Sequence, residues 1–158
     1  MSTYVLVHGA WHTGRELAPV AALIKAAGHE VFTPTIKGNG AGDAKTVGLA
    51  EAIESIADSV LENDLEDVVL AGHSYGGMVI TGVADELPDR IRRLVYWNAF
   101  VPNSGESLVD MVPPELARLS SPWRPNDATV RSSFRSRSGA KRLSTTPTST
   151  RRSAHIVR

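Results

Sequence analysis

The amino-acid sequence predicts an α/β protein in which helices flank a parallel sheet. Short apolar runs rich in β-branched and aromatic residues alternate with longer segments of helical periodicity, and glycine or proline marks the junctions. Strands that alternate with helices are joined by crossovers, which make neighbouring strands parallel. Four strands are predicted, at residues 4–7, 31–33, 67–71 and 91–100.

The first half of the chain contains a strand, a helix, a second strand and a loop. The first run ends at His8 and Gly9, which indicates a turn after the strand. Apolar residues then recur with helical spacing from Leu17 to Ala27, and Gly28 ends this predicted helix. Residues 31–33 form the second strand before Pro34, and a glycine-rich loop is expected at residues 37–43.

The second half of the chain repeats this alternation. One face of the next predicted helix is apolar, formed by Leu49, Ile53, Ile56, Ala57, Val60 and Leu61. The strand at 67–71 and a helix at 77–87 follow, and the strand at 91–100 should be most buried at residues 94–97. A short helix is expected at residues 115–119, after two prolines.

Composition places the chain among globular proteins with one domain. Its 158 residues are 42% hydrophobic, enough to build a core. No apolar run is long enough for a membrane span, and the first residues lack the pattern of a signal peptide. We therefore expect a cytoplasmic protein with no membrane partner. Because cysteine is absent, any chemistry rests on serine, histidine and carboxylates rather than on thiolates or cysteine-bound metals.

Charge divides the chain into two parts. Residues 1–130 hold 9 basic and 17 acidic side chains, whereas residues 131–158 hold 8 basic and no acidic ones. The sequence also becomes rich in serine, arginine, threonine and proline from Ser120 onward. We therefore expect a partial α/β core and the start of a cap at residues 1–118, and an aberrant, disordered basic tail at 119–158.

A shifted reading frame explains the tail. When residues 135–155 are back-translated and read one base earlier, the codons permit a string with helical apolar spacing and balanced charge. We expect a frameshift between Leu119 and Arg131. The alternative is a genuine basic tail that binds nucleic acid or an acidic partner, but no aromatic pattern accompanies the charges, so we expect no nucleic-acid partner.

A G-x-S-x-G motif carries the strongest chemical signal. It runs from Gly72 to Gly76, with Ser74 at its centre, and lies between the third predicted strand and the next helix. This is the context of a nucleophile elbow, in which a sharp turn exposes the serine. Ser74 is therefore the candidate nucleophile.

Three segments resemble one known family in order and spacing: Val5–His12, Val69–Ile80 and Leu94–Pro102. Together they look like α/β-hydrolases of the plant methylesterase and hydroxynitrile lyase type and their bacterial esterase relatives. The resemblance implies the N-terminal part of an α/β-hydrolase fold, with Ser74 attacking a small carboxylic ester without metal or cofactor. It also implies an oxyanion hole formed by the N–H groups of Tyr75 and of Ala10 or its neighbour Trp11.

Other residues near these motifs are expected to contact substrate or to support the structure of the site. Trp11 and His12 are candidate substrate contacts, although the aromatic residues that the family has shortly after His12 are missing. His8 is expected to shape the oxyanion loop and His73 to pack or hydrogen-bond. A structural role is the simpler interpretation of Asn98, which stands where many relatives carry an acid.

A triad acid and base are expected to be absent. The order in this fold is serine, acid, histidine, and the only histidine after Ser74 is His155, in the basic tail. Pairing it with Asp127 is disfavoured. The leading hypothesis is therefore an impaired ester hydrolase, with hydroxynitrile lyase-like cleavage or a non-catalytic truncated fragment as alternatives. A sheet that stops after four strands should expose an edge, so we also expect self-association.

Overall fold

Four parallel strands form a single sheet in the computed structural model, which describes residues 1–44 and 46–113. The order across the sheet is β2-β1-β3-β4, and all three pairings are parallel. The predicted α/β class and the parallel sheet are therefore confirmed. The strands are β1 (Thr3–Val7), β2 (Glu30–Phe32), β3 (Val68–Ser74) and β4 (Ile91–Ala99).

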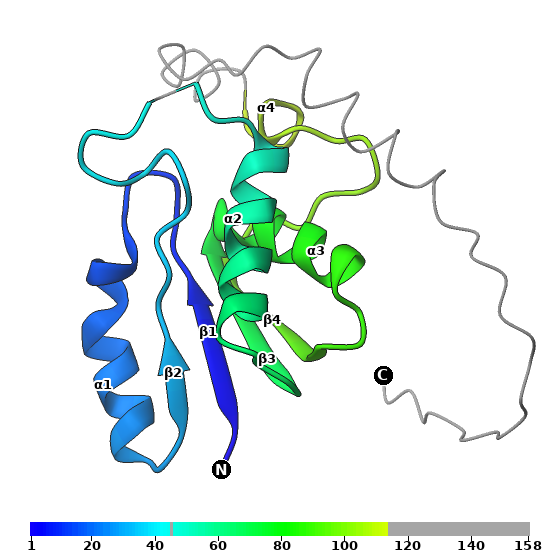
Figure 1. Ribbon diagram of the computed structural model, residues 1–158. Helices are drawn as coiled ribbons and strands as arrows, with labels where there is room; N and C mark the ends of the chain where they lie inside the picture. The colour runs from blue at the N-terminus through cyan, green and yellow to red at the C-terminus, as the bar shows by residue number, and fades with distance from the viewer. Residues whose placement is uncertain (45, 114–158) are drawn as a thin grey trace, which may run out of the picture.

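Helices cover both faces of the sheet, but unequally. Figure 1 shows α1 on one side of the sheet and α2 and α3 on the other. The apolar face predicted for α2 is buried at Ile53, Ile56 and Val60, whereas Leu61, predicted on the same face, is 45% exposed. The helical segments are the 3-10 turn η1 (Gly14–Leu17), α1 (Ala18–Ala26), α2 (Leu49–Glu62), α3 (Gly76–Glu86) and α4 (Leu108–Met111).

The core is divided by the sheet into two apolar clusters. The larger cluster includes Leu70 of β3, Ile56 of α2 and Ile80 of α3, each fully buried. The smaller cluster has four buried members beside α1, which are Leu6, Leu17, Ala21 and Val31. Alternation along the strands explains the division, because successive side chains point to opposite faces.

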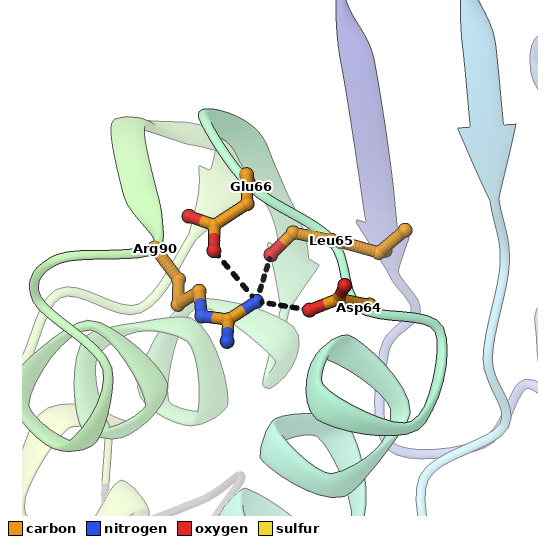
Figure 2. Close-up of polar contacts among 4 residues, drawn as sticks. All are labelled: Asp64, Leu65, Glu66 and Arg90. Atoms are coloured by element: carbon orange, nitrogen blue, oxygen red, sulfur yellow. Dashed lines mark hydrogen bonds and ion pairs between the residues drawn. The ribbon is translucent and has the colours of Figure 1, made fainter.

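A polar corner joins the turns that lead into β3 and β4. Arg90 precedes β4, and its Nη1 donates to Asp64 Oδ1 at 2.9 Å and to the Leu65 carbonyl at 3.3 Å. The same nitrogen lies 2.9 Å from Glu66 Oε1 (Figure 2). Asp64 has a φ of 47°, in the left-handed region. Arg90 therefore links the turn after α2 to the start of β4.

The prediction about burial in the last strand was also wrong. Residues 94–97 were expected to be the most buried part of the last strand, but Val95 is 39% exposed and Trp97 51% exposed. Both lie on the face of the sheet that carries α1, opposite Ala71 and His73 of β3. The smaller cluster beside α1 is built on β1 and β2, so α1 leaves Val95 and Trp97 of β4 outside this cluster.

Several predictions fall outside the described residues. The helix at 115–119, the tail at 119–158 and the boundary at 118 all lie there in whole or in part. The short helix α4 was not predicted, although Ser107 and Asp110 form a capping box at its start. Within residues 1–44 and 46–113, no helix is both long and apolar enough to cross a membrane.

Candidate active site

Ser74 ends β3 and adopts a backbone conformation that is costly for any residue except glycine. Its φ is 54°, in the left-handed region. Tyr75 follows in helical conformation, and α3 begins at Gly76. This strand–turn–helix geometry is that of a nucleophile elbow.

Close backbone contacts explain the two outer glycines of the motif. A Cβ atom on Gly72 would lie 2.6 Å from the Gly76 carbonyl oxygen, across the turn itself. A Cβ atom on Gly76 would lie 2.6 Å from the carbonyl oxygen of Val7, at the end of β1. The sharp turn and its position against β1 therefore both require glycine.

The loop after β1 lies directly beside Ser74. Val7 pairs with Gly72 in the parallel register of β1 and β3, so both strands end at the same edge of the sheet. A Cβ atom on Gly9 would lie 3.2 Å from the Cβ of Ser74. Residues 9–12 therefore lie beside Ser74, as an oxyanion loop requires.

Two side chains hold this loop in place. The buried His8 ring donates from Nδ1 to the Gly9 carbonyl at 2.8 Å and accepts from the Ile36 N–H at Nε2, at 3.0 Å. Desolvation by burial lowers the pKa of His8, which keeps the ring neutral and able to accept. Asn39 Nδ2 donates to the Ala10 carbonyl at 2.6 Å and to the His12 carbonyl at 2.9 Å.

His8 thus has the loop-shaping role predicted from the sequence, whereas Asn39 was missed. Asn39 lies in the predicted glycine-rich loop and reaches Ala10 across 29 residues of sequence. The only sequence signal for this role is an amide side chain in a loop. The neighbouring residues do not indicate that its partners are the carbonyls of Ala10 and His12.

The predicted oxyanion residues belong to two segments, the loop after β1 and the start of α3. Ala10 is half-buried in the loop after β1, and Trp11 beside it is 83% exposed. Tyr75 caps the start of α3, while its side chain is buried in the larger cluster. Burial raises the pKa of the Tyr75 hydroxyl, so this group stays protonated and acts as part of the core.

Aromatic rings line the α1 side of the elbow. The His73 ring lies 5.0 Å from the ring of Trp97 and 6.4 Å from that of His12, measured between centroids. His73 therefore packs beside Ser74, in agreement with its predicted role. The His12 side chain, next to His73, is exposed to solvent.

The described residues supply no charge relay to Ser74. No histidine or carboxylate within residues 1–44 and 46–113 hydrogen-bonds the Ser74 hydroxyl. Asp110 accepts from Ser107, at the start of α4. Asp127 and His155 lie outside the described residues. Within residues 1–44 and 46–113, no group of three or more histidine or acidic side chains is placed to bind a metal ion.

Comparisons with known proteins agree with the resemblance found in the sequence. A carbendazim hydrolyzing esterase from Nocardioides sp. (strain SG-4G) is 47% identical over 119 residues, covering 73% of this chain and 49% of the esterase. An alpha-hydroxynitrile lyase from Arabidopsis thaliana is 31% identical, covering 64% of this chain and 41% of the lyase. The chain thus spans about half the length of these relatives, or less.

The fold and the family comparison lead to the same conclusion. A solved extracellular alpha/beta-hydrolase from a Paenibacillus species superposes with a TM-score of 0.74 at 37% identity, covering 77% of this chain and 50% of that one. The alpha/beta hydrolase family matches residues 4–155. The parallel sheet and the elbow described above have the arrangement expected of that family, so the chain belongs to the alpha/beta hydrolases.

Proposed function

We propose that this chain carries the nucleophile and the oxyanion hole of a serine hydrolase acting on small carboxylic esters. The observation that carries the proposal is the left-handed φ of Ser74. Ser74 lies between Gly72 and Gly76, where any side chain would collide with the backbone of the turn or of β1. Esterase chemistry is favoured over lyase chemistry because the relative named an esterase is 47% identical and the lyase 31%.

In this proposal Ser74 attacks the ester carbonyl to form a tetrahedral intermediate. Its oxyanion accepts hydrogen bonds from the N–H of Tyr75 and from the N–H of Ala10 or Trp11. The position of Tyr75 at the N-terminal end of α3 supports this role, because the helix dipole favours negative charge there. Each such donor is worth about 3 kcal/mol of transition-state stabilisation.

The substrate would contact the exposed side of the same loop. Trp11 and His12 are both exposed there, and His12 adjoins the His73 ring. We assign them to substrate contact rather than to proton transfer. The partner is thus a small ester, and no metal or cofactor takes part in the proposed step. A cytoplasmic location belongs to the same proposal, although the similar Paenibacillus hydrolase is described as extracellular.

The 158-residue chain should hydrolyse esters slowly. No histidine or carboxylate of residues 1–44 and 46–113 hydrogen-bonds the Ser74 hydroxyl, so in this proposal the oxyanion hole and substrate binding provide only residual catalysis, which in serine hydrolases is about 10³–10⁴-fold over water.

Hydrolysis of p-nitrophenyl acetate by the full chain tests the proposal. We expect slow release of p-nitrophenolate together with a Ser74-linked acetyl group, detected by mass spectrometry, which Ser74→Ala removes and Ser59→Ala, in α2, leaves intact. A wild type that is never acetylated on Ser74 would overturn the role of Ser74. Turnover near the ordinary enzymatic value of about 10 s⁻¹ would overturn the impairment instead.

A further inference from the structure

The loop after β1, residues 9–12, lies between two other segments. In the sheet β1 stands between β2 and β3, so the segment after β2 borders this loop on one side and Ser74, at the end of β3, borders it on the other. Asn39 contacts the loop from the β2 side. A Cβ atom on Gly9 would lie 3.2 Å from the Ser74 Cβ, on the β3 side. The direction of each peptide group in the loop therefore decides whether Ser74 faces N–H donors or carbonyl acceptors.

Asn39 holds the middle of this loop. Its Nδ2 donates to the Ala10 oxygen at 2.6 Å and to the His12 oxygen at 2.9 Å. In a trans peptide the N–H points away from the carbonyl of the same unit. Because the Ala10 carbonyl is turned toward Asn39, the N–H of Trp11 in that peptide is turned the opposite way. This N–H therefore faces the side of the loop on which Ser74 lies.

The preceding peptide of the loop has a different support. The Gly9 oxygen accepts from His8 Nδ1 at 2.8 Å and from the His12 N–H at 3.2 Å. Both bonds orient the peptide unit that carries the Ala10 N–H. The two N–H groups of the loop are therefore held separately, the first through His8 and the second through Asn39.

The Asn39 side chain is itself held in a tight turn. The Asp43 carboxylate accepts at Oδ2 from the two N–H groups that flank this residue, Gly38 at 3.0 Å and Gly40 at 2.9 Å. The Asn39 N–H donates to the Ile36 carbonyl at 3.0 Å. Only the nitrogen of an asparagine amide can donate, so the two bound carbonyls also fix which way the amide faces. Asn39 is therefore placed as a rigid support for the loop.

A hydrogen bond to a carbonyl also affects the other end of the same peptide. Hydrogen bonds in a chain polarise one another, so a donor on the Ala10 oxygen makes the Trp11 N–H a stronger donor. An oxyanion hole needs strong donors aimed at the place where negative charge develops. The bond from Asn39 contributes to both the direction and the strength of this N–H.

We propose that Asn39 is a positioning residue for oxyanion stabilisation, which turns the Ala10–Trp11 peptide so that its N–H faces Ser74 and its carbonyl faces away. The role rests on the proposed ester hydrolysis, because it concerns the oxyanion hole of that reaction. Asn39 touches no reacting atom and acts only through the loop. Its loss should therefore slow acylation without weakening the binding of the ester.

Acetylation of Ser74 by p-nitrophenyl acetate, followed by mass spectrometry of the full chain, tests this role. Asn39→Asp replaces the amide by a carboxylate of the same shape, which is ionised at neutral pH and can only accept. The acetylation rate should fall about 100-fold, the loss typical of one oxyanion-hole donor, at an unchanged half-saturating ester concentration. The matched control Asn63→Asp removes an amide that donates to the Ser59 carbonyl at 2.8 Å, in α2, and should react at the wild-type rate.

The acetyl group on Ser74 also reports directly on the donors around it. Hydrogen bonds to a carbonyl oxygen lower its stretching frequency, which infrared difference spectroscopy with an isotope-labelled acetyl carbonyl measures. The band should move to higher wavenumber in Asn39→Asp and in Asn39→Ala, and should stay in place in Asn63→Asp. Asn39→Ala removes the donor without adding a charge, so it measures the same bond if the carboxylate prevents folding.

The possible results separate this role from the proposed function. A wild type that is never acetylated on Ser74 would overturn the proposed function and the role of Asn39 with it. Acetylation at equal rates in the wild type and the Asn39 variants would overturn the role of Asn39 alone. Slower acetylation with an unmoved carbonyl band would also overturn it, because Asn39 would then affect only stability.

Discussion

The two faces of the sheet differ in how fully the described helices cover them. Beneath α2 and α3, 17 buried residues form one continuous cluster. Beside α1 only four residues are buried together, and the β4 part of that face exposes Val95 and Trp97. Both faces are built from the same strands, so the difference comes from which helices lie over them.

This difference places the candidate nucleophile on the better-packed face. Ser74 leads directly into α3, whose Met78, Val79 and Ile80 are fully buried in the larger cluster. The strain at Ser74 is therefore held by a region with many apolar contacts, as strained functional residues require. The α1 face instead leaves Val95 and Trp97 of β4 exposed.

The largest expected effect comes from the same substitution made on each face. Leu70→Ala removes a fully buried side chain from the larger cluster, and Leu6→Ala removes a buried side chain that is 6% exposed from the smaller one. Leucine-to-alanine changes in cores cost about 2–5 kcal/mol, and the cost is higher where the site cannot collapse. We expect Leu70→Ala near the top of that range and Leu6→Ala near the bottom, measured by urea unfolding. The reverse order would contradict the comparison of the two faces.

The second expected effect concerns pH and the loop beside Ser74. Burial lowers the pKa of His8 in the folded chain, whereas the unfolded chain binds a proton on this ring below about pH 6.5. His8 therefore contributes stability that is fully present above pH 6.5 and is lost as the pH falls toward its folded pKa. The slope from one such group is at most about 1.4 kcal/mol per pH unit.

Comparison with His8→Gln isolates this contribution. Glutamine can accept the Ile36 N–H but does not titrate, so the variant should lose the part of the slope below pH 6.5 that His8 supplies. Unfolding free energies at several pH values between 5 and 8 measure it. Parallel pH profiles for the two proteins would rule out His8 as the source.

The third expected effect is a gain in stability at the candidate nucleophile. Ser74→Gly relieves a left-handed φ that costs other residues about 1–2 kcal/mol, less the entropy that glycine loses on folding, about 0.5–1 kcal/mol. We expect a net gain of about 0.5–1 kcal/mol in urea unfolding. The control Ser59→Gly, inside α2, should lose about 0.5 kcal/mol. A loss at both positions would show that Ser74 is not strained.

Local sequence patterns predicted the parts of the fold that depend on local physics. Strand–helix alternation and the G-x-S-x-G spacing depend on neighbours within a few residues, so the sheet and the position of Ser74 could be predicted. The exposure of Trp97 depends on which helices cover which face, and the contact of Asn39 with Ala10 joins two distant loops. The spacing of apolar residues along the chain predicts neither the exposure of Trp97 nor the hydrogen bond from Asn39 to Ala10.

The short helix α4 is a different kind of omission. Four residues are too few to show helical periodicity, but Ser107 followed three positions later by Asp110 is a capping signal that the sequence contains. At the site, the resemblance of residues 5–12 to the family predicted the loop beside Ser74. The hydrogen bonds that hold this loop could not be predicted, because they come from Ile36 and Asn39 in another segment.

The smallest expected effect is at Arg90, which joins the turns leading into β3 and β4. Its partners Asp64 and Glu66 are 87% and 64% exposed, so water and salt screen both ion pairs strongly. Arg90→Gln should lower the thermal midpoint slightly at low ionic strength, and the difference from wild type should shrink at high salt. Thermal melts at two salt concentrations measure it. A difference that high salt leaves unchanged would mean that the bond from Arg90 to the Leu65 carbonyl, rather than charge, holds the corner together.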